Sequence, residues 1–149
     1  MIKPIQNNLV IELHVPDFDL AKQFYGILGF NKVTFEHAPT ADEPGYIVLK
    51  RKDEQGDTMI NLYGGNEKVY NQSYFKKFPK DTKRGYATEL TIPVKDIDGF
   101  FNKIAPLIPN NIQQPVMDKV DGDVKWRDCR IEDPFGFYLR FTELIDWGQ

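Results

Sequence analysis

The sequence predicts an α+β fold in which one strand–helix–three-strand unit occurs twice in tandem. Val10–Asp17 aligns with Glu89–Asp96, a separation of 79 residues (89 − 10). Met59–Tyr63 aligns with Tyr138–Thr142 at the same separation. Each copy also opens with an alternating strand pattern that is followed by a helix pattern. Because repeated sequence indicates repeated structure, each copy predicts what the other should contain.

The first copy begins with an alternating strand at 9–15. A helix follows through about Leu28, with Asp17 or Asp19 as its cap and Gly29 as its end. Three further strands are expected near 32–37, 45–51 and 58–63, since residues that favour turns separate these β-rich runs.

The second copy repeats this order. A strand at 86–94 precedes a helix at 96–107, which ends at a pair of prolines. Strands are expected near 111–117, 124–132 and 137–143, and the turn Asp133-Pro134-Phe135-Gly136 separates the last two. A single domain over 1–149 is therefore predicted, with module one at 8–63, a linker at 64–84 and module two at 85–143.

The predicted linker is basic and contains several aromatic residues. It carries Lys68, Lys76, Lys77, Lys80, Lys83 and Arg84. A nucleic-acid-binding arm is one interpretation of this composition. We favour a solvated surface segment with Tyr70, Tyr74 and Phe75 tucked onto the domain.

Composition narrows the class of protein. The chain has 149 residues, 41% of them hydrophobic, which is typical of one compact globular domain. No apolar run has the length of a membrane span, and the first eight residues lack the apolar stretch of a signal peptide, so a cytoplasmic location is expected. The one cysteine excludes an internal disulfide. A net charge of −3 argues against a nucleic-acid partner.

Several motifs of the chain resemble those of the vicinal oxygen chelate superfamily. They are Leu13-x-Val15-x-Asp17, Phe24-Tyr25, Leu28-Gly29-Phe30 and Asp133-Pro134-x-Gly136. This superfamily includes glyoxalase I, extradiol dioxygenases and the fosfomycin- and bleomycin-resistance proteins. The resemblance implies two βαβββ modules whose curled mixed sheets surround a shared cleft. It also implies a homodimer, in which the cleft is completed within one chain or across two.

The metal-binding positions of the superfamily are not occupied by metal ligands. They fall on Val10, Asn61, Glu89 and Arg140. Only Glu89 is a good ligand, because valine cannot coordinate, asparagine is a weak donor and arginine brings a fixed positive charge. Zinc, iron and manganese sites usually need three or four imidazole or carboxylate donors. No metal ion and no cofactor is therefore expected, and the chain is most similar to the metal-free bleomycin-resistance branch.

Counting every second residue along the strands predicts which side chains line the cleft. One face should form the core through Ile11, Leu13, Val15, Ile60, Leu62, Leu90, Ile92, Val94, Leu139 and Phe141. The other face, with Trp126 of a later strand, gives the predicted ligand-binding residues Val10, Glu12, His14, Met59, Asn61, Tyr63, Glu89, Thr91, Trp126, Tyr138 and Arg140, and it also carries Thr142. Aromatic and apolar walls with a few charges suit an amphipathic or aromatic organic molecule.

Several of these residues allow more than one interpretation. Glu89 and Arg140 form an ion pair across neighbouring strands, or Arg140 binds a ligand carboxylate, or Glu89 binds a ligand amine. Trp126 is a core or dimer contact, or a stacking wall. His14 is a hydrogen-bonded cleft residue, or it forms a displaced metal site with Glu12 and Glu89.

Three functions follow, and the fold alone does not choose among them. The first is a metal-independent binding protein for a small organic ligand, a role that includes antibiotic resistance. The second is a lyase, isomerase or dioxygenase with a displaced metal site. The third is a partner-binding module with a vestigial cleft. No catalytic residue is identified: Cys129 is expected to be a packed thiol and His37 a surface residue. Bleomycin itself is not favoured, because binders of this cationic drug are strongly acidic. No nucleic-acid or membrane partner is predicted.

Overall fold

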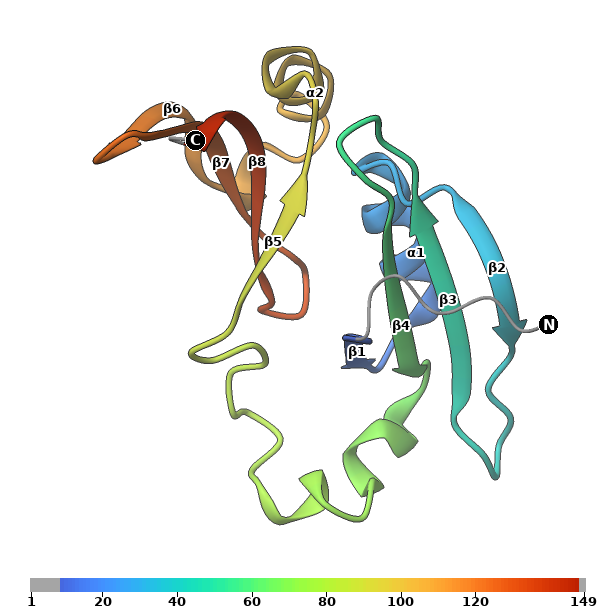
Figure 1. Ribbon diagram of the computed structural model, residues 1–149. Helices are drawn as coiled ribbons and strands as arrows, with labels where there is room; N and C mark the ends of the chain where they lie inside the picture. The colour runs from blue at the N-terminus through green and yellow to red at the C-terminus, as the bar shows by residue number, and fades with distance from the viewer. Residues whose placement is uncertain (1–8, 148–149) are drawn as a thin grey trace, which may run out of the picture.

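The computed structural model describes residues 9–147 and contains two sheets of four strands (Figure 1). The first module comprises β1 (Glu12–Val15), α1 (Phe18–Ile27), β2 (Lys32–His37), β3 (Gly45–Arg51) and β4 (Thr58–Gly64). Its strands lie in the order β1-β4-β3-β2, which we call sheet A. β1 pairs with β4 in parallel, and the remaining pairs are antiparallel.

The second module has the same arrangement. It comprises β5 (Glu89–Pro93), α2 (Ile97–Ile104), β6 (Ile112–Asp121), β7 (Val124–Glu132) and β8 (Tyr138–Trp147). Its strands lie in the order β5-β8-β7-β6, which we call sheet B. The short helix η3 (Pro109–Asn111) precedes β6. The predicted α+β fold with two βαβββ modules is therefore confirmed.

The repeat is present in the strand register as well as in the order of elements. In sheet A, Glu12 lies opposite Asn61. In sheet B, Thr91 lies opposite Arg140, and both residues are 79 positions further along the chain (91 − 12 and 140 − 61). Because a slip of one residue would move every side chain to the other face, this shared register places equivalent residues on equivalent faces.

The first helix begins and ends as its sequence predicts. The Asp17 carboxylate accepts a hydrogen bond from the Leu20 backbone N–H at 3.0 Å, which satisfies one free donor of the first turn. At the other end Gly29 has φ of 98°, a conformation that costs other residues free energy. Phe24, Tyr25 and Leu28 on one side of this helix are buried.

Both sheets contribute to one hydrophobic core. Leu13, Val15, Ile60 and Leu62 of sheet A and Ile92, Leu139 and Phe141 of sheet B are buried in the same cluster. The predicted core face is confirmed, with Ile11 and Leu90 partly buried against it. Since adjacent residues of a strand point to opposite faces, each sheet has an outer face that is directed away from this core.

Two polar contacts join the modules inside the core. The Tyr25 hydroxyl of α1 donates to the Asp133 carboxylate at 2.6 Å, and both side chains are buried. Burial, with the nearby carboxylate of Asp133, raises the pKa of Tyr25 well above its usual value. Arg51 of β3 donates to the carbonyl oxygen of Pro93 in β5 at 3.3 Å, and within its own module to that of Leu28 at 3.0 Å.

The linker extends over residues 65–88 and contains η1 (Glu67–Asn71) and η2 (Phe75–Lys77). It leaves the end of β4 and returns to β5, so it passes beneath both sheets in Figure 1. Two strands are longer than predicted: β6 reaches Asp121 and forms a hairpin with β7, and β8 reaches Trp147. No helix among residues 9–147 is long and apolar enough to cross a membrane.

Candidate functional site

Six of the predicted ligand-binding residues belong to the side of sheet A: five lie on its strands β1 and β4, and one shortly precedes β1. Glu12 and His14 of β1 and Asn61 and Tyr63 of β4 are opposite one another in the parallel pair. The His14 and Tyr63 rings have centroids 4.5 Å apart. The His14 Nε2 atom lies 2.9 Å from the Glu12 carboxylate. Val10 precedes β1. Met59 lies at the start of β4, with 51% of its surface exposed.

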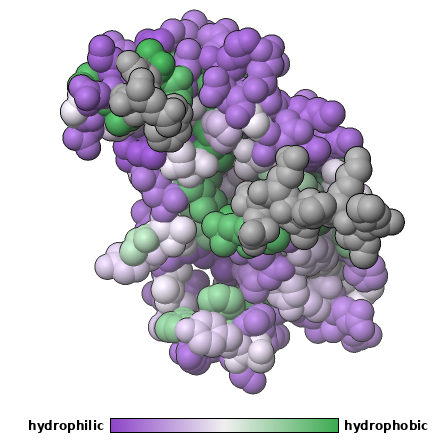
Figure 2. All heavy atoms as spheres, viewed as in Figure 1, coloured by the Kyte–Doolittle hydropathy of each residue, from purple (hydrophilic) through white to green (hydrophobic). Residues whose placement is uncertain are grey.

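A cavity of about 540 Å³ lies between β1, the start of β5 and the linker, and we call it the linker cavity. Figure 2 shows a hollow between the linker and the body of the molecule on this side. Val10, Glu12 and His14 line it, as three of the predicted residues. Its other walls come largely from aromatic side chains of the linker and of the β7–β8 turn: Tyr70, Tyr74, Phe75, Phe78, Tyr86 and Phe137.

The linker is therefore part of the site, which the sequence analysis did not anticipate. Phe75 packs edge-on against His14, with ring centroids 5.0 Å apart. Arg84 donates a hydrogen bond of 2.8 Å to the His14 carbonyl oxygen and so fastens the linker to β1. Phe75 and Tyr74 nevertheless keep about half of their surface exposed, at 47% and 55%. The predicted tucking of these rings onto the domain is thus incomplete.

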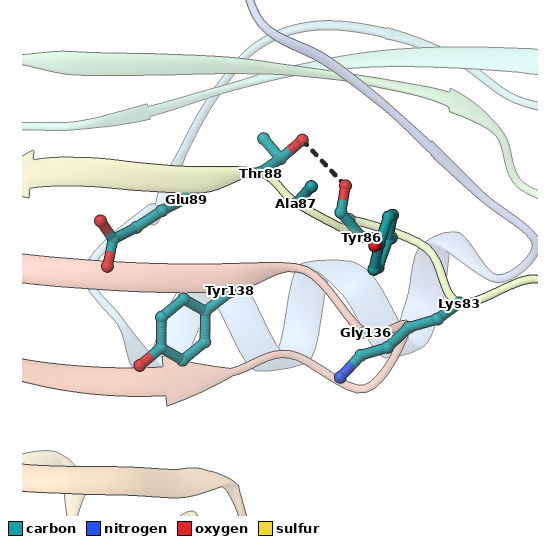
Figure 3. Close-up of a pocket in the computed structure, with 8 residues that line it drawn as sticks. Lys83, Tyr86, Ala87, Thr88, Glu89, Gly136 and Tyr138 are labelled. Carbon is teal, nitrogen blue, oxygen red and sulfur yellow. Dashed lines mark hydrogen bonds between the residues drawn. The ribbon is translucent and has the colours of Figure 1, made fainter.

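A second, smaller cavity of about 310 Å³ lies on the other side of linker residues 83–88 (Figure 3). Glu89 and Tyr138, two predicted ligand-binding residues, line it. They are opposite one another in the parallel β5–β8 pair, and Figure 3 shows their side chains adjacent. Lys83 brings a positive charge to the same cavity.

The outer face of sheet B carries two arginines and a buried carboxylate. We call Asp128, Arg130, Tyr138, Arg140 and Thr142 the arginine face, because these residues alternate along β7 and β8. Glu89 forms an ion pair with Arg130, which the sequence analysis did not consider. The predicted ion pair between Glu89 and Arg140 is wrong, because Glu89 lies opposite Tyr138 in the register.

Trp126 is held beside the arginine face by a hydrogen bond. Its indole N–H donates to the Asp128 carboxylate at 3.0 Å. The other oxygen of this fully buried carboxylate accepts a hydrogen bond of 2.7 Å from the Gln114 amide. The indole is thereby fixed in place on the outer side of β7, while it remains partly exposed. Thr91, the last of the predicted residues, lies exposed on β5 opposite Arg140.

The predicted residues thus form two groups, one on each sheet. Val10, Glu12, His14, Met59, Asn61 and Tyr63 belong to the side of sheet A, and the other five belong to sheet B. The linker cavity contains members of the first group and the smaller cavity contains members of the second. Linker residues Lys83, Gly85, Tyr86 and Thr88 line both cavities, so the two cavities are neighbours.

The donors needed for a metal ion are not gathered in the part of the chain that the structure describes. No group of three or more His, Cys, Asp or Glu side chains there could hold a metal ion. Glu12, His14 and Glu89 therefore do not form the displaced metal site considered above. The four superfamily positions do not fit a metal either, since only Glu89 offers a charged donor, and its carboxylate is paired with Arg130.

Cys129 and His37 do not join either cavity. Cys129 is fully buried on the core side of β7. Burial and the neighbouring Asp128 carboxylate raise the pKa of this thiol to about 12, so the nucleophilic thiolate is scarce at neutral pH. His37 is the exposed last residue of β2. The predictions of a packed thiol and a surface histidine are confirmed.

The sequence matches no protein-family model and no curated protein. Solved structures are similar over nearly the whole chain. A glyoxylase/bleomycin resistance protein/dioxygenase domain from Frankia sp. EAN1pec is 13% identical with a TM-score of 0.61, covering 95% of this chain and 100% of that one. A glyoxalase family protein from Enterococcus faecalis is 19% identical with a TM-score of 0.56, covering 93% and 98%.

A bleomycin-binding protein, solved in complex with bleomycin, is 18% identical with a TM-score of 0.51. The match covers 93% of this chain and 98% of that one. The expected resemblance to the glyoxalase/bleomycin resistance protein/dioxygenase superfamily is therefore confirmed in the fold. At these identities the likeness is one of fold alone.

Proposed function

We propose that the protein binds a small amphipathic or aromatic organic molecule without the help of a metal ion. The observation that carries this proposal is the linker cavity of about 540 Å³, walled by aromatic rings and reached by Glu12 and His14. Its volume lies in the range of roughly 300–1,000 Å³ that is usual for small-molecule sites. Apolar walls provide burial and a few polar groups fix the orientation of the ligand.

The proposed ligand would lie between two kinds of ring. The half-exposed Phe75 and Tyr74 come from the linker, and His14, whose ring packs against Tyr63, comes from sheet A. Covering an exposed aromatic surface with a planar apolar group is favourable, in proportion to the apolar area that is buried. The fold of the bleomycin-binding protein, which holds an organic drug, is compatible with this role.

We also propose that two copies of the chain associate. The outer faces of sheets A and B are both directed away from the shared core, so one chain cannot bring them face to face. A second copy can place its sheet B over sheet A. Large apolar residues are exposed on both sheets, among them Met59 on sheet A and Met117 and Ile145 on sheet B. Sedimentation of the wild-type chain and of Met59→Lys over a range of concentrations tests this association.

The binding test uses Nile red, a neutral planar dye whose fluorescence rises in apolar surroundings. We expect saturable binding of about one dye per chain and a weaker affinity in Phe75→Ala. Phe35→Ala is the matched control, because Phe35 is a similarly exposed phenylalanine on β2, outside the residues that line the linker cavity. A fluorescence rise without saturation, or an equal affinity in Phe75→Ala, would contradict the proposal.

The metal-dependent lyase, isomerase or dioxygenase is tested separately by elemental analysis of protein purified without a histidine tag. We expect substoichiometric zinc, iron, nickel and manganese, since Glu12, His14 and Glu89 form no metal-binding group. Near-stoichiometric metal would overturn metal independence and favour the enzyme. Antibiotic resistance and a cytoplasmic location stay predictions from the sequence.

A further inference from the structure

Two arginines lie directly opposite one another on the outer face of sheet B. Arg130 of β7 and Arg140 of β8 are partners in the antiparallel register. Like charges at directly opposed positions destabilise a sheet, so this pair has no obvious role in folding. Both side chains are partly buried, so water screens the repulsion between their charges less than it would at a fully exposed site.

The acidic residues near this pair are used by one arginine only. The Arg130 guanidinium contacts Glu89 and lies 3.5 Å from the Asp128 carboxylate. The Asp128 carboxylate is further occupied by Trp126 and Gln114. Arg140 has no hydrogen-bond or ion-pair partner within residues 9–147. One guanidinium is therefore engaged by carboxylates, while its neighbour has no such partner among residues 9–147.

Among the residues that the structure describes, three donor atoms on this face are buried without a partner. They are Nε of Arg130, Nε of Arg140 and the Thr142 hydroxyl. Thr142 follows Arg140 by two residues on β8, so the two side chains share a face. Buried polar groups in folded proteins are nearly always hydrogen-bonded. Leaving a buried donor of a charged guanidinium without a hydrogen bond is especially costly in free energy. A bound ligand with acceptor oxygens would supply partners for these donors.

We propose that the arginine face binds the carboxylate group of a small organic ligand, at a site distinct from the linker cavity. A guanidinium presents its N–H groups as a planar fork that matches the two oxygens of a carboxylate. Arg140 supplies the free fork, and the Thr142 hydroxyl and Arg130 Nε supply further donors. This inference deepens the proposed function, and it rests on that function for the small organic nature of the ligand.

The surroundings of Arg140 select the charge and the shape of the anion. The two carboxylates of Glu89 and Asp128 already equal the two arginines in number. A second negative charge on the ligand would therefore be repelled more than the first. A monoanionic carboxylate is therefore favoured over a phosphate dianion. Tyr138 lies two residues before Arg140 on the same face and lines the smaller cavity (Figure 3). A flat body attached to the carboxylate could rest against that ring.

Three small probes at constant ionic strength test the proposal by isothermal titration calorimetry: benzoate, its neutral isostere benzamide, and inorganic phosphate. We expect benzoate to bind more tightly than benzamide and phosphate. Arg140→Gln should weaken benzoate binding by about tenfold or more, the loss expected for one charge-assisted bidentate contact. Arg127→Gln is the matched control on β7, since Arg127 pairs with Asp98 and Asp118 instead.

Arginine Nε–H resonances provide a second readout. Benzoate should shift the Nε–H signals of Arg140 and Arg130 and leave that of Arg127 unchanged. Arg140→Lys keeps the charge but removes the planar fork, so it should also weaken benzoate binding while the protein melts at the wild-type temperature. Equal benzoate affinity in the wild type and both Arg140 variants would overturn the proposal. Benzamide binding as tightly as benzoate, or phosphate binding more tightly, would overturn it too.

The two proposals fail in different experiments. Loss of saturable Nile red binding concerns the linker cavity, and Arg140→Gln should leave that binding unchanged. Loss of benzoate discrimination concerns the arginine face, and Phe75→Ala should leave it unchanged. If Nile red binds saturably but benzoate does not bind more tightly than benzamide, the proposed function is retained and the carboxylate site is rejected.

Discussion

The outer faces of sheets A and B occupy the same positions of a repeated unit, yet they differ in chemical character. Glu12 lies opposite Asn61 and Thr91 lies opposite Arg140 in the same register. Sheet A presents rings, a methionine and the Glu12 carboxylate, whereas sheet B presents two arginines beside two carboxylates. The inner faces remain apolar in both copies. Duplication has thus preserved the surface that folds the chain, while the surface that is free to bind has diverged.

The largest expected effect tests the conserved half of this comparison. Leu62 and Phe141 are equivalent buried residues, 79 positions apart (141 − 62), in the shared core. Phe141→Ala should lower the free energy of unfolding by about 3–5 kcal/mol and Leu62→Ala by about 2–5 kcal/mol, because each leaves a cavity among packed side chains. Urea denaturation of both variants measures this. A single transition is expected in each, since both residues belong to one core; two separate transitions would show that the modules unfold independently.

The inner faces were predictable because they depend only on local alternation. Leu13 and Val15, or Leu139 and Phe141, are two residues apart, and this spacing alone assigns them to one side of a strand. The helix cap at Asp17 and the stop at Gly29 are likewise local signals. These features need no knowledge of which strands become neighbours.

The outer faces were only partly predictable because their contacts join distant segments. The partner of Glu89 depends on which residue of β7 lies beside β8, and no local pattern indicates Arg130. The linker cavity depends on how residues 65–88 fold back over β1. Most of this segment is irregular, so its sequence has no periodic pattern from which the path could be predicted. One signal was available for the β6–β7 hairpin: Asp121-Gly122-Asp123, in which Gly122 has φ of 59°.

A smaller effect is expected where the two modules meet. Tyr25→Phe removes the hydroxyl that donates to Asp133, a buried carboxylate whose pKa is raised by burial. The loss should be about 1.5–3 kcal/mol, as for a hydrogen bond to a charged group. Denaturant unfolding at pH 7 measures it. Asp133 keeps its backbone donors Phe135 and Phe137, so the β7–β8 turn should remain folded.

The same contact predicts a loss of stability at alkaline pH. The pKa of Tyr25 is raised in the folded state, so above about pH 10 the unfolded chain releases this proton and the folded chain retains it. The folded state then binds more protons than the unfolded state, and stability falls as the pH rises. Thermal unfolding between pH 9 and 11 should show a shallower decline in Tyr25→Phe than in the wild type. An equally steep decline in both would show that Tyr25 is not the group responsible.

The smallest expected effect separates the two outer faces by charge. Glu89 is 34% exposed at its side chain, so its pairing with Arg130 should contribute at most about 1 kcal/mol to stability. Glu89→Gln removes one of the two carboxylates that neutralise Arg130, and the arginine face should then attract anions more strongly. Benzoate affinity should rise on the order of twofold, equivalent to about 0.4 kcal/mol. Glu12→Gln provides the control on sheet A, because Glu12 contacts His14 and no arginine of the pair. Calorimetric titration of both variants decides between two roles for Glu89. If Glu89→Gln weakens benzoate binding, Glu89 holds Arg130 in its binding position; if binding strengthens, the carboxylate competes with the ligand for the same guanidinium.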